Sequence, residues 1–242
     1  RSETDCQPSG VSSLEFSRSY RSRWGSNEDR VQVGLGRAWT HSSAYRLVAT
    51  PIADPNSVAV VLPEGAVRTF VKMPNATSWT ALGSADLLTA AAGTWAYQRA
   101  EDGTTFGFDG EGKLQTKLAR SGAVTSYAYD GSGRLSSIAD SFGRTLILGY
   151  SATGQLLTTT REDARSVTYG YDITGRLTSV TYPDTKSRGF LYENVSFPYA
   201  LTGIVDEVGV RWATFEYDPK GRPIKTELAG GVERYQVTYP YT

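Results

Sequence analysis

The sequence predicts an all-β protein, an antiparallel meander of repeated β-hairpins that forms a curved strip. Three observations support this prediction: the composition, a motif that recurs at a fixed period, and turn signals about every ten residues. The chain has 242 residues, with 25 Gly and 15 Tyr but a single Met. Tyr, Thr and Val suit pleated surfaces, and Gly suits turns.

The repeat is clearest in two stretches that share Tyr-x-Tyr-Asp-x-x-Gly-Arg-Leu. They read YAYDGSGRL at residues 127–135 and YGYDITGRL at residues 169–177. Pairs of aromatic or apolar residues separated by one residue begin at Phe106, Tyr127, Leu148, Tyr169 and Phe190, a period of about 21 residues. The next steps, to Phe215 and Val237, are longer. We expect a loop insertion at residues 193–200 to account for the lengthening.

Four units carry the spacing of a type I turn, Asp-x-x-Gly, beginning at Asp109, Asp130, Asp172 and Asp218, and the unit between the second and third of these has Ser151 in place of the aspartate. The aspartate side chain can accept a backbone N–H there, and glycine adopts the positive φ that closes the loop. Aromatic rings at alternate positions share one face of a strand, so stacked units build an aromatic stripe. The expected structural positions are Tyr127, Tyr129, Asp130, Gly133, Arg134, Leu135, Tyr169, Tyr171, Asp172, Gly175, Arg176, Leu177, Tyr217, Asp218, Gly221 and Arg222.

The first hundred residues lack this repeat. Residues 31–39 and 57–71 are predicted to form strands with turns. Residues 84–93 are either a short helix capped by Ser84 or a buried strand. We therefore expect residues 1–105 to form an N-terminal β-rich region and residues 106–242 to form the repeat array, with continuous β structure between them.

The charges and reactive residues argue against several function classes. The chain has 25 basic and 25 acidic residues, so bulk charge does not favour binding to nucleic acid or to an anionic membrane. It has no apolar run long enough to span a membrane. His41 and Cys6 are the only residues of their types, which leaves no internal disulfide, His-rich metal cluster or triad around another histidine. We expect no catalytic, cofactor-binding or metal-binding residue, although a carboxylate pair formed only in space stays open.

The repeat positions have alternative interpretations. The turn aspartates could bind calcium, although one aspartate per turn suits capping better than a site of converging oxygens. The aromatic series could stack on sugars or pack the core. The cations at positions 113, 134, 176 and 222 could form a basic ladder for an anionic partner or an ion-paired surface.

The Tyr-Asp unit with Gly-Arg-Leu resembles the YD repeats of Rhs proteins, which occur in bacterial polymorphic toxins, toxin-complex proteins and teneurins. The similarity covers about residues 95–242. LEFSRSYRSR at residues 14–23 and VGLGRAW at residues 33–39 look like the segment that precedes the repeats in bacterial Rhs toxins. The resemblance implies a β-strip that coils into a hollow shell and encloses a toxic C-terminal domain until delivery.

The expected function is therefore that of a non-enzymatic shell fragment without a cofactor. Its implied partners are the rest of its own shell and the enclosed toxin, and its implied location is secreted or at the cell surface. The alternative is a surface adhesin that binds glycans or a protein receptor. The sequence begins without Met, and we expect it to be a fragment whose free strand edge invites pairing with a second copy.

Overall fold

The computed structural model describes residues 2–6, 14–22, 33–50, 56–73, 76 and 78–240. In this part of the chain the strands form three antiparallel sheets, and no α-helix is present. The predicted all-β fold class is confirmed. No helix among these residues has the length and apolar composition that crossing a membrane requires.

Two small sheets come first in the chain. One has the order β1-β2-β3 and the other β4-β5-β6-β7. Their strands are β1 (Ser2–Cys6), β2 (Phe16–Tyr20), β3 (Trp39–His41), β4 (Arg46–Thr50), β5 (Ser57–Val61), β6 (Val67–Val71) and β7 (Thr80–Ala81).

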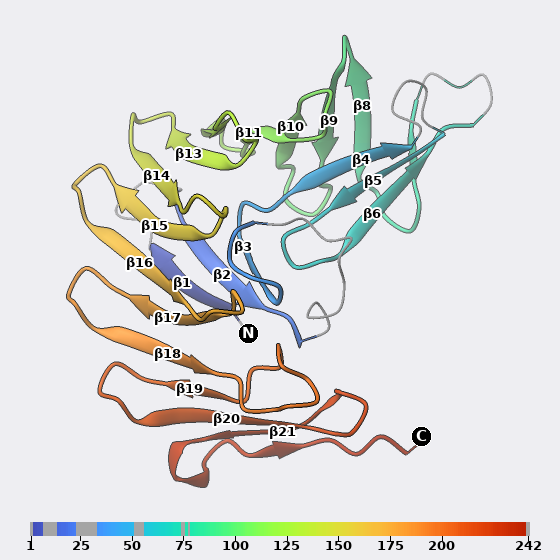
Figure 1. The fold of residues 1–242 in the computed structure, drawn as a ribbon. Coiled ribbons are helices and arrows are strands. Elements are labelled where there is room, and N and C mark those ends of the chain that lie inside the picture. Colours follow the sequence, from blue (N-terminus) through green and yellow to red (C-terminus); the bar gives the residue numbers. More distant parts are fainter. Residues whose placement is uncertain are drawn as a thin grey trace.

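The third sheet has 15 strands, each paired with its neighbours in sequence, so it is one uninterrupted meander. It arcs around β1, β2 and β3 without closing on itself (Figure 1). Its strands are β8 (Leu87–Ala91), β9 (Thr94–Gln98), β10 (Thr105–Phe108), β11 (Leu114–Leu118), β12 (Val124–Tyr129), β13 (Leu135–Asp140), β14 (Thr145–Tyr150), β15 (Leu156–Arg161), β16 (Ser166–Tyr171), β17 (Leu177–Thr181), β18 (Ser187–Leu191), β19 (Gly203–Val205), β20 (Arg211–Tyr217), β21 (Pro223–Leu228) and β22 (Tyr235–Gln236), with a short 3-10 turn, η2 (Ala229–Gly231), before the last.

Two expectations for the N-terminal region are wrong. Residues 33–38 are irregular, because Gly34 and Gly36 adopt φ values of 78° and 79°, outside the range of a pleated strand; residues 31–32 lie outside the described part. The helix alternative for residues 84–93 fails because β8 pairs with β9 along its whole length. β8 is also largely exposed rather than buried, as expected for the first strand of the sheet.

The long sheet begins before the expected start of the repeat array. β8 and β9 pair in series with β10, whose residues span the expected boundary at 105. That boundary stays a prediction. The lengthened repeat contains the expected loop, since residues 192–202 between β18 and β19 form no strand.

The repeat turn has a defined geometry, seen at Asp130. Gly133 N donates to Asp130 O at 2.8 Å, and Asp130 N donates to Arg134 O at 2.8 Å. Gly133 has φ +74°, and the strand register shifts between Ala128 and Tyr129. This combination is a type I turn followed by a left-handed residue and a β-bulge. The same pair of backbone hydrogen bonds occurs at the turns that begin at Asp109, Ser151, Asp172 and Asp218.

One hydrophobic core joins the N-terminal strands to the repeats. Phe16 and Trp39 from the small sheet belong to the same buried cluster as Leu156, Tyr169 and Leu177 of the long sheet. Because β1–β3 and the long sheet share this cluster, the N-terminal strands cover one face of the repeats.

Replacing Gly133 by valine should lower the free energy of unfolding by about 1–3 kcal/mol, because a β-branched residue is strained at positive φ. Thermal and urea unfolding measure the loss. Gly131→Val is the matched control in the same turn, since its φ is not positive and an added Cβ meets nothing within 4 Å. Equal stabilities of the two variants would contradict the assigned turn.

His41 should make folding stability depend on pH. The ring is 3% exposed, and burial lowers its pKa to about 3. An unfolded histidine has a pKa of about 6.5, so the unfolded state binds the proton first and stability falls as the pH drops below that value. We expect the free energy of unfolding to be about 2 kcal/mol lower at pH 5 than at pH 7.5.

Chemical denaturation across this pH range measures the effect, and His41→Gln is the comparison because it cannot titrate. His41 is the only histidine in the chain, so the difference between the two pH profiles reports one group. Parallel profiles would show that His41 is not held neutral.

Candidate functional site

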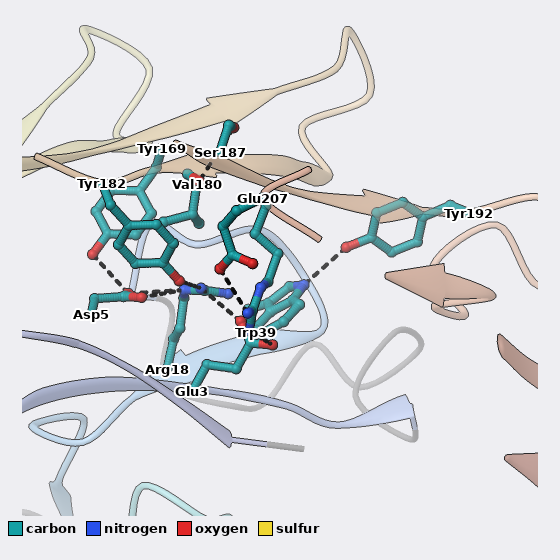
Figure 2. A network of polar contacts seen from close by, with 11 residues as sticks. Glu3, Asp5, Arg18, Trp39, Tyr169, Val180, Tyr182, Ser187, Tyr192 and Glu207 are labelled. Carbon is teal, nitrogen blue, oxygen red and sulfur yellow. Dashed lines mark hydrogen bonds and ion pairs between the residues drawn. The ribbon is translucent and has the colours of Figure 1, made fainter. Parts of the chain in front are cut away.

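The candidate site is the buried contact between β1–β3 and the covered face of the long sheet. Its centre is Arg18 on β2, whose side chain has no exposed surface (Figure 2). The alternation of β2 places Phe16, Arg18 and Tyr20 on one buried face. An arginine between two aromatic residues is thus carried into the core.

Arg18 is bound by two carboxylates of the neighbouring strand β1. Its Nε donates to both oxygens of Asp5, at 2.9 and 2.8 Å, and its Nη2 donates to Glu3 Oε2 at 2.8 Å. Burial opposes the positive charge, but Asp5 and Glu3 outweigh it and raise the pKa of Arg18 above its ordinary value. Arg18 is therefore held as a cation in the core.

The repeats add further partners to this network. Tyr169 on β16 donates from its hydroxyl to Asp5 Oδ2 at 3.0 Å, and Arg18 Nη2 donates to the hydroxyl of Tyr182 at 3.3 Å. Arg188 on β18 bridges Glu3 at 3.1 Å and Glu207 at 2.7 Å. Charges of alternating sign thus run from β1 and β2 across to β18 and the turn after β19.

Aromatic rings enclose the Arg18 guanidinium. Its central carbon lies 5.2 Å from the centroid of Trp39 and 5.0 Å from that of Phe190. Trp39 Nε1 donates to the hydroxyl of Tyr192 at 2.9 Å. Cation–π contact compensates part of the lost hydration, which matters because Arg18 Nη1 has no hydrogen-bond partner among the described residues.

The loop at residues 192–202 receives Tyr20. The Tyr20 hydroxyl donates to Tyr199 O at 3.1 Å and accepts from Leu201 N at 2.8 Å. Arg176 Nη1 donates to Pro198 O at 2.8 Å and ties the loop to the turn of an earlier repeat. The insertion that lengthens the period therefore forms a docking point for β2.

Gly34 packs against the repeat turn at Gly154, at a distance that leaves no room for a Cβ atom. Leu156 N donates to Gly34 O at 2.9 Å. The Tyr171 hydroxyl shares its one proton between the same oxygen, at 3.0 Å, and Leu156 O, at 2.7 Å. A Cβ at Gly34 would lie 2.8 Å from Gly154 O. The backbone at residue 34 consequently lies directly against a repeat turn.

The predicted repeat positions lie in the turns that begin at Asp130, Asp172 and Asp218 and in the strands beside them, and the network around Arg18 uses one of them, Tyr169. Asp130 Oδ1 accepts from Ser132 N and Arg134 N at 2.9 Å, and Asp130 Oδ2 pairs with Arg134 Nε at 2.7 Å. The backbone N–H of Arg134 is the main cause that lowers the pKa of Asp130. The turns of Asp172 and Asp218 have the same pattern with Arg176 and Arg222.

The second aromatic position forms a ladder of hydrogen bonds. The Tyr129 hydroxyl donates to Leu114 O at 2.8 Å, and Tyr150 donates to Leu135 O at 2.9 Å. The same bond joins Tyr171 to Leu156, Tyr192 to Leu177, Tyr217 to Leu201 and Tyr239 to Pro223. The first aromatic positions pack instead: Tyr127 and Tyr169 are buried, as are Leu135 and Leu177 after the turns.

Turn cations cover the rings of the next repeat. The guanidinium carbon of Arg134 lies 4.9 Å from the ring centroid of Tyr150, and that of Arg176 lies 5.2 Å from that of Tyr192. Since the same arginines pair with their own turn aspartates, the cation series is an ion-paired and stacked surface along much of its length.

Sequence reasoning missed the Arg18 network and the tyrosine ladder. The ladder had a signal: the second aromatic is Tyr in six successive units, whereas the first varies among Phe, Tyr, Leu and Val. The restriction of the second position to tyrosine indicates that its hydroxyl group is needed there, since phenylalanine would otherwise serve as well. For the network, the alternation Phe16-x-Arg18-x-Tyr20 beside Glu3 and Asp5 was the available signal.

The site can hold two parts of the chain together, and its chemistry is that of ion pairs and phenol hydrogen bonds. Within the described ranges, no group of three or more His, Cys, Asp or Glu side chains is placed to hold a metal ion. Cys6 is buried beside Thr159, with 3.9 Å between sulfur and hydroxyl oxygen, and burial raises its pKa.

Two family models match the chain. The model described as RHS Repeat matches residues 102–145 and 150–187, and the model described as Domain of unknown function (DUF6531) matches residues 1–70. The two matches follow each other in the chain as the N-terminal segment and the repeats do. A search of curated proteins gives no match.

Solved structures with similar chains include TcdB2-TccC3 without its hypervariable C-terminal region, with 18% identity and a TM-score of 0.42 over 71% of this chain. Another is the Photorhabdus luminescens Tc holotoxin pore, with 16% identity and a TM-score of 0.40 over 75% of this chain. The chain spans 11% and 14% of the length of those two chains. The repeat match, together with the observed succession of hairpins, confirms the expected resemblance: the chain carries RHS repeats at residues 102–145 and 150–187, with a DUF6531 segment at residues 1–70 ahead of them.

Proposed function

We propose that this chain is a wall segment of a hollow β-shell that encloses a C-terminal toxin or effector domain until delivery. The observation that carries the proposal is the single-layer strip of 15 strands in sequence order, which arcs without closing. Such a strip separates two sides and can be extended at its end. Among the described strands β22 pairs with β21 alone, so its other edge is available to a further strand.

The N-terminal strands have a distinct role in this proposal, which is to fill the inner side of the arc (Figure 1). A wall that only enclosed a cargo would leave its apolar inner face in water at this end. β1–β3 bury that face, and the Arg18 network fixes their register against β16 and β18. The N-terminal region, residues 1–105, then supplies the closing strands β1–β3 and the first strands of the wall, and the repeat array, residues 106–242, forms the rest of the wall.

The proposed role is structural rather than enzymatic. The repeat positions are occupied in holding neighbouring hairpins: each turn carboxylate binds backbone N–H groups, and each tyrosine hydroxyl of the ladder binds a carbonyl. The proposed partners are the rest of the same shell and the enclosed domain, and the proposed site of action is outside the producing cell. Rings covered by turn cations offer little free face to a sugar, which favours containment over the adhesin.

Containment predicts protection of a C-terminal domain in the complete protein that contains this sequence. We expect that domain to be digested by a broad-specificity protease at least tenfold more slowly in the complete protein than when it is produced alone, since the wall excludes the protease. Digestion followed by mass spectrometry gives both rates. Equal rates would overturn the proposal, and glycan-array binding by the 242-residue chain alongside equal rates would favour the adhesin.

Arg18→Met should release the N-terminal strands from the repeats. The change leaves Asp5 and Glu3 buried without their main cation, and breaking a buried ion pair in this way costs about 3–5 kcal/mol. We expect faster proteolysis within residues 1–50 while the repeat strip stays resistant. Limited proteolysis and hydrogen exchange measure both parts.

Arg165→Met is the matched control, because the Arg165 side chain is 63% exposed and its ion pair among the described residues is with Asp163 in its own turn. It should leave the cleavage rate within residues 1–50 unchanged. If Arg18→Met also left that rate unchanged, the network would not be what holds β1–β3 in place.

A further inference from the structure

The N-terminal segment meets a row of repeat turns, and its contacts skip one of them. Leu47 N donates to Gly112 O at 3.0 Å, and Gly34 O accepts from Leu156 N beside Gly154. A Cβ added at Gly36 would lie 2.7 Å from Gly175 O. Backbone of the N-terminal segment therefore lies against the turns at residues 112, 154 and 175.

The turn at Gly133 is different. The nearest atoms to a Cβ added there are Lys113 Nζ and Cε, at 3.2 and 3.5 Å, which belong to the preceding repeat. A cavity of about 280 Å³ lies at this turn, lined among others by His41, Arg46, Lys113 and Arg134. The cavity occupies the place that main chain fills at the other three turns.

Among the described residues that line this cavity, three are cations and none is acidic. Lys113 pairs with Glu111 at 2.8 Å and Arg134 with Asp130 at 2.7 Å, so these two are partly neutralised outside the cavity. The described residues offer no ion pair to Arg46. Its backbone is bridged to that of Lys113, which keeps β4 beside the repeat turn.

The positive charge of Arg46 affects the pKa of Tyr129, which lines the cavity. Burial and, to a smaller extent, the negative charge of Asp109 raise the pKa of Tyr129 to about 12, and the positive charge of Arg46 opposes that rise. The cavity is thus a partly buried space with one guanidinium that forms no ion pair with any described residue, and the planar fork of such a group suits carboxylate and phosphate oxygens.

His41 adds a neutral donor. Its Nδ1 accepts from Ser43 N at 3.2 Å, so in the neutral ring the proton is on Nε2. Both His41 and Ser43 line the cavity. The polar side chains that line the cavity therefore include three cations and the neutral hydrogen-bond donor His41.

We propose that this cavity binds a compact anion that carries phosphate or carboxylate groups, with Arg46 as its principal charge contact. Lys113 and Arg134 add positive potential from two successive repeats. The ligand would occupy the cavity beside the Gly133 turn, which the backbone of the N-terminal segment does not cover. It would link β4 to the long sheet.

The test is isothermal titration of the 242-residue chain with pyrophosphate and, separately, with citrate, at constant ionic strength so that bulk screening does not change. We expect saturable binding at one site. Arg46→Gln should weaken it about tenfold or more, as expected for loss of a charge-assisted hydrogen bond. Binding of pyrophosphate alone or of citrate alone assigns the ligand to the phosphate or the carboxylate class.

Arg165→Gln removes the same charge from an exposed turn elsewhere and should leave the affinity unchanged. Amide shifts in the unaltered chain give a second readout, independent of whether the variants fold: Ser43 and Gly133 should shift on titration, and Gly209 in a distant turn should not. No saturable binding of either probe would overturn the proposal. Equal weakening by Arg46→Gln and Arg165→Gln, or shifts at Gly209 as large as at Gly133, would also overturn it.

Discussion

A hydrogen bond from a tyrosine hydroxyl to a carbonyl of the preceding hairpin sets the spacing on which the rest of the structure depends. Tyr129, Tyr150, Tyr171 and Tyr192 each bond a carbonyl 15 residues earlier, so each bond joins two neighbouring repeats. One such bond contributes only about 1 kcal/mol. Repeated along the strip, it holds neighbouring hairpins in register, and Tyr217 keeps the bond, to Leu201, even where the period lengthens.

The N-terminal segment depends on that register. Gly34 and Leu47 bond backbone groups of turn regions that belong to different repeats, which requires the turns to be correctly spaced. Where the period lengthens, the added loop accepts the hydroxyl of Tyr20. The Arg18 network then selects one register of β1 and β2 against the sheet. A buried network of this kind contributes less net stability than an apolar core of the same volume, but every misaligned arrangement would leave a charge unpaired.

Much of the repeat array could be predicted from the sequence, because a periodic pattern reports local structure. The turn at Asp130 and the loop at residues 193–200 both follow from spacing alone. Contacts between distant segments have no such period: Arg188 meets Glu3 from 185 residues away. The same limit explains the error at residues 33–38, where alternation predicted a strand but Gly34 and Gly36 serve a docking contact that lies outside the local sequence. At residues 84–93 strand pairing with β9 outweighed helix signals.

The interface between the N-terminal segment and the repeats contains two polar clusters that differ in their compensation. Around Arg18, carboxylates and phenol groups meet the cation at hydrogen-bond distance. Around Arg46, the lining residues supply cations and a neutral histidine but no carboxylate. Removing a charge from water is costly unless a partner replaces the lost hydration. A cation paired with carboxylates, like Arg18, stabilises the contact between its two segments, whereas a cation to which the described residues offer no carboxylate keeps its affinity for an external anion. The two clusters therefore have different roles in the same interface.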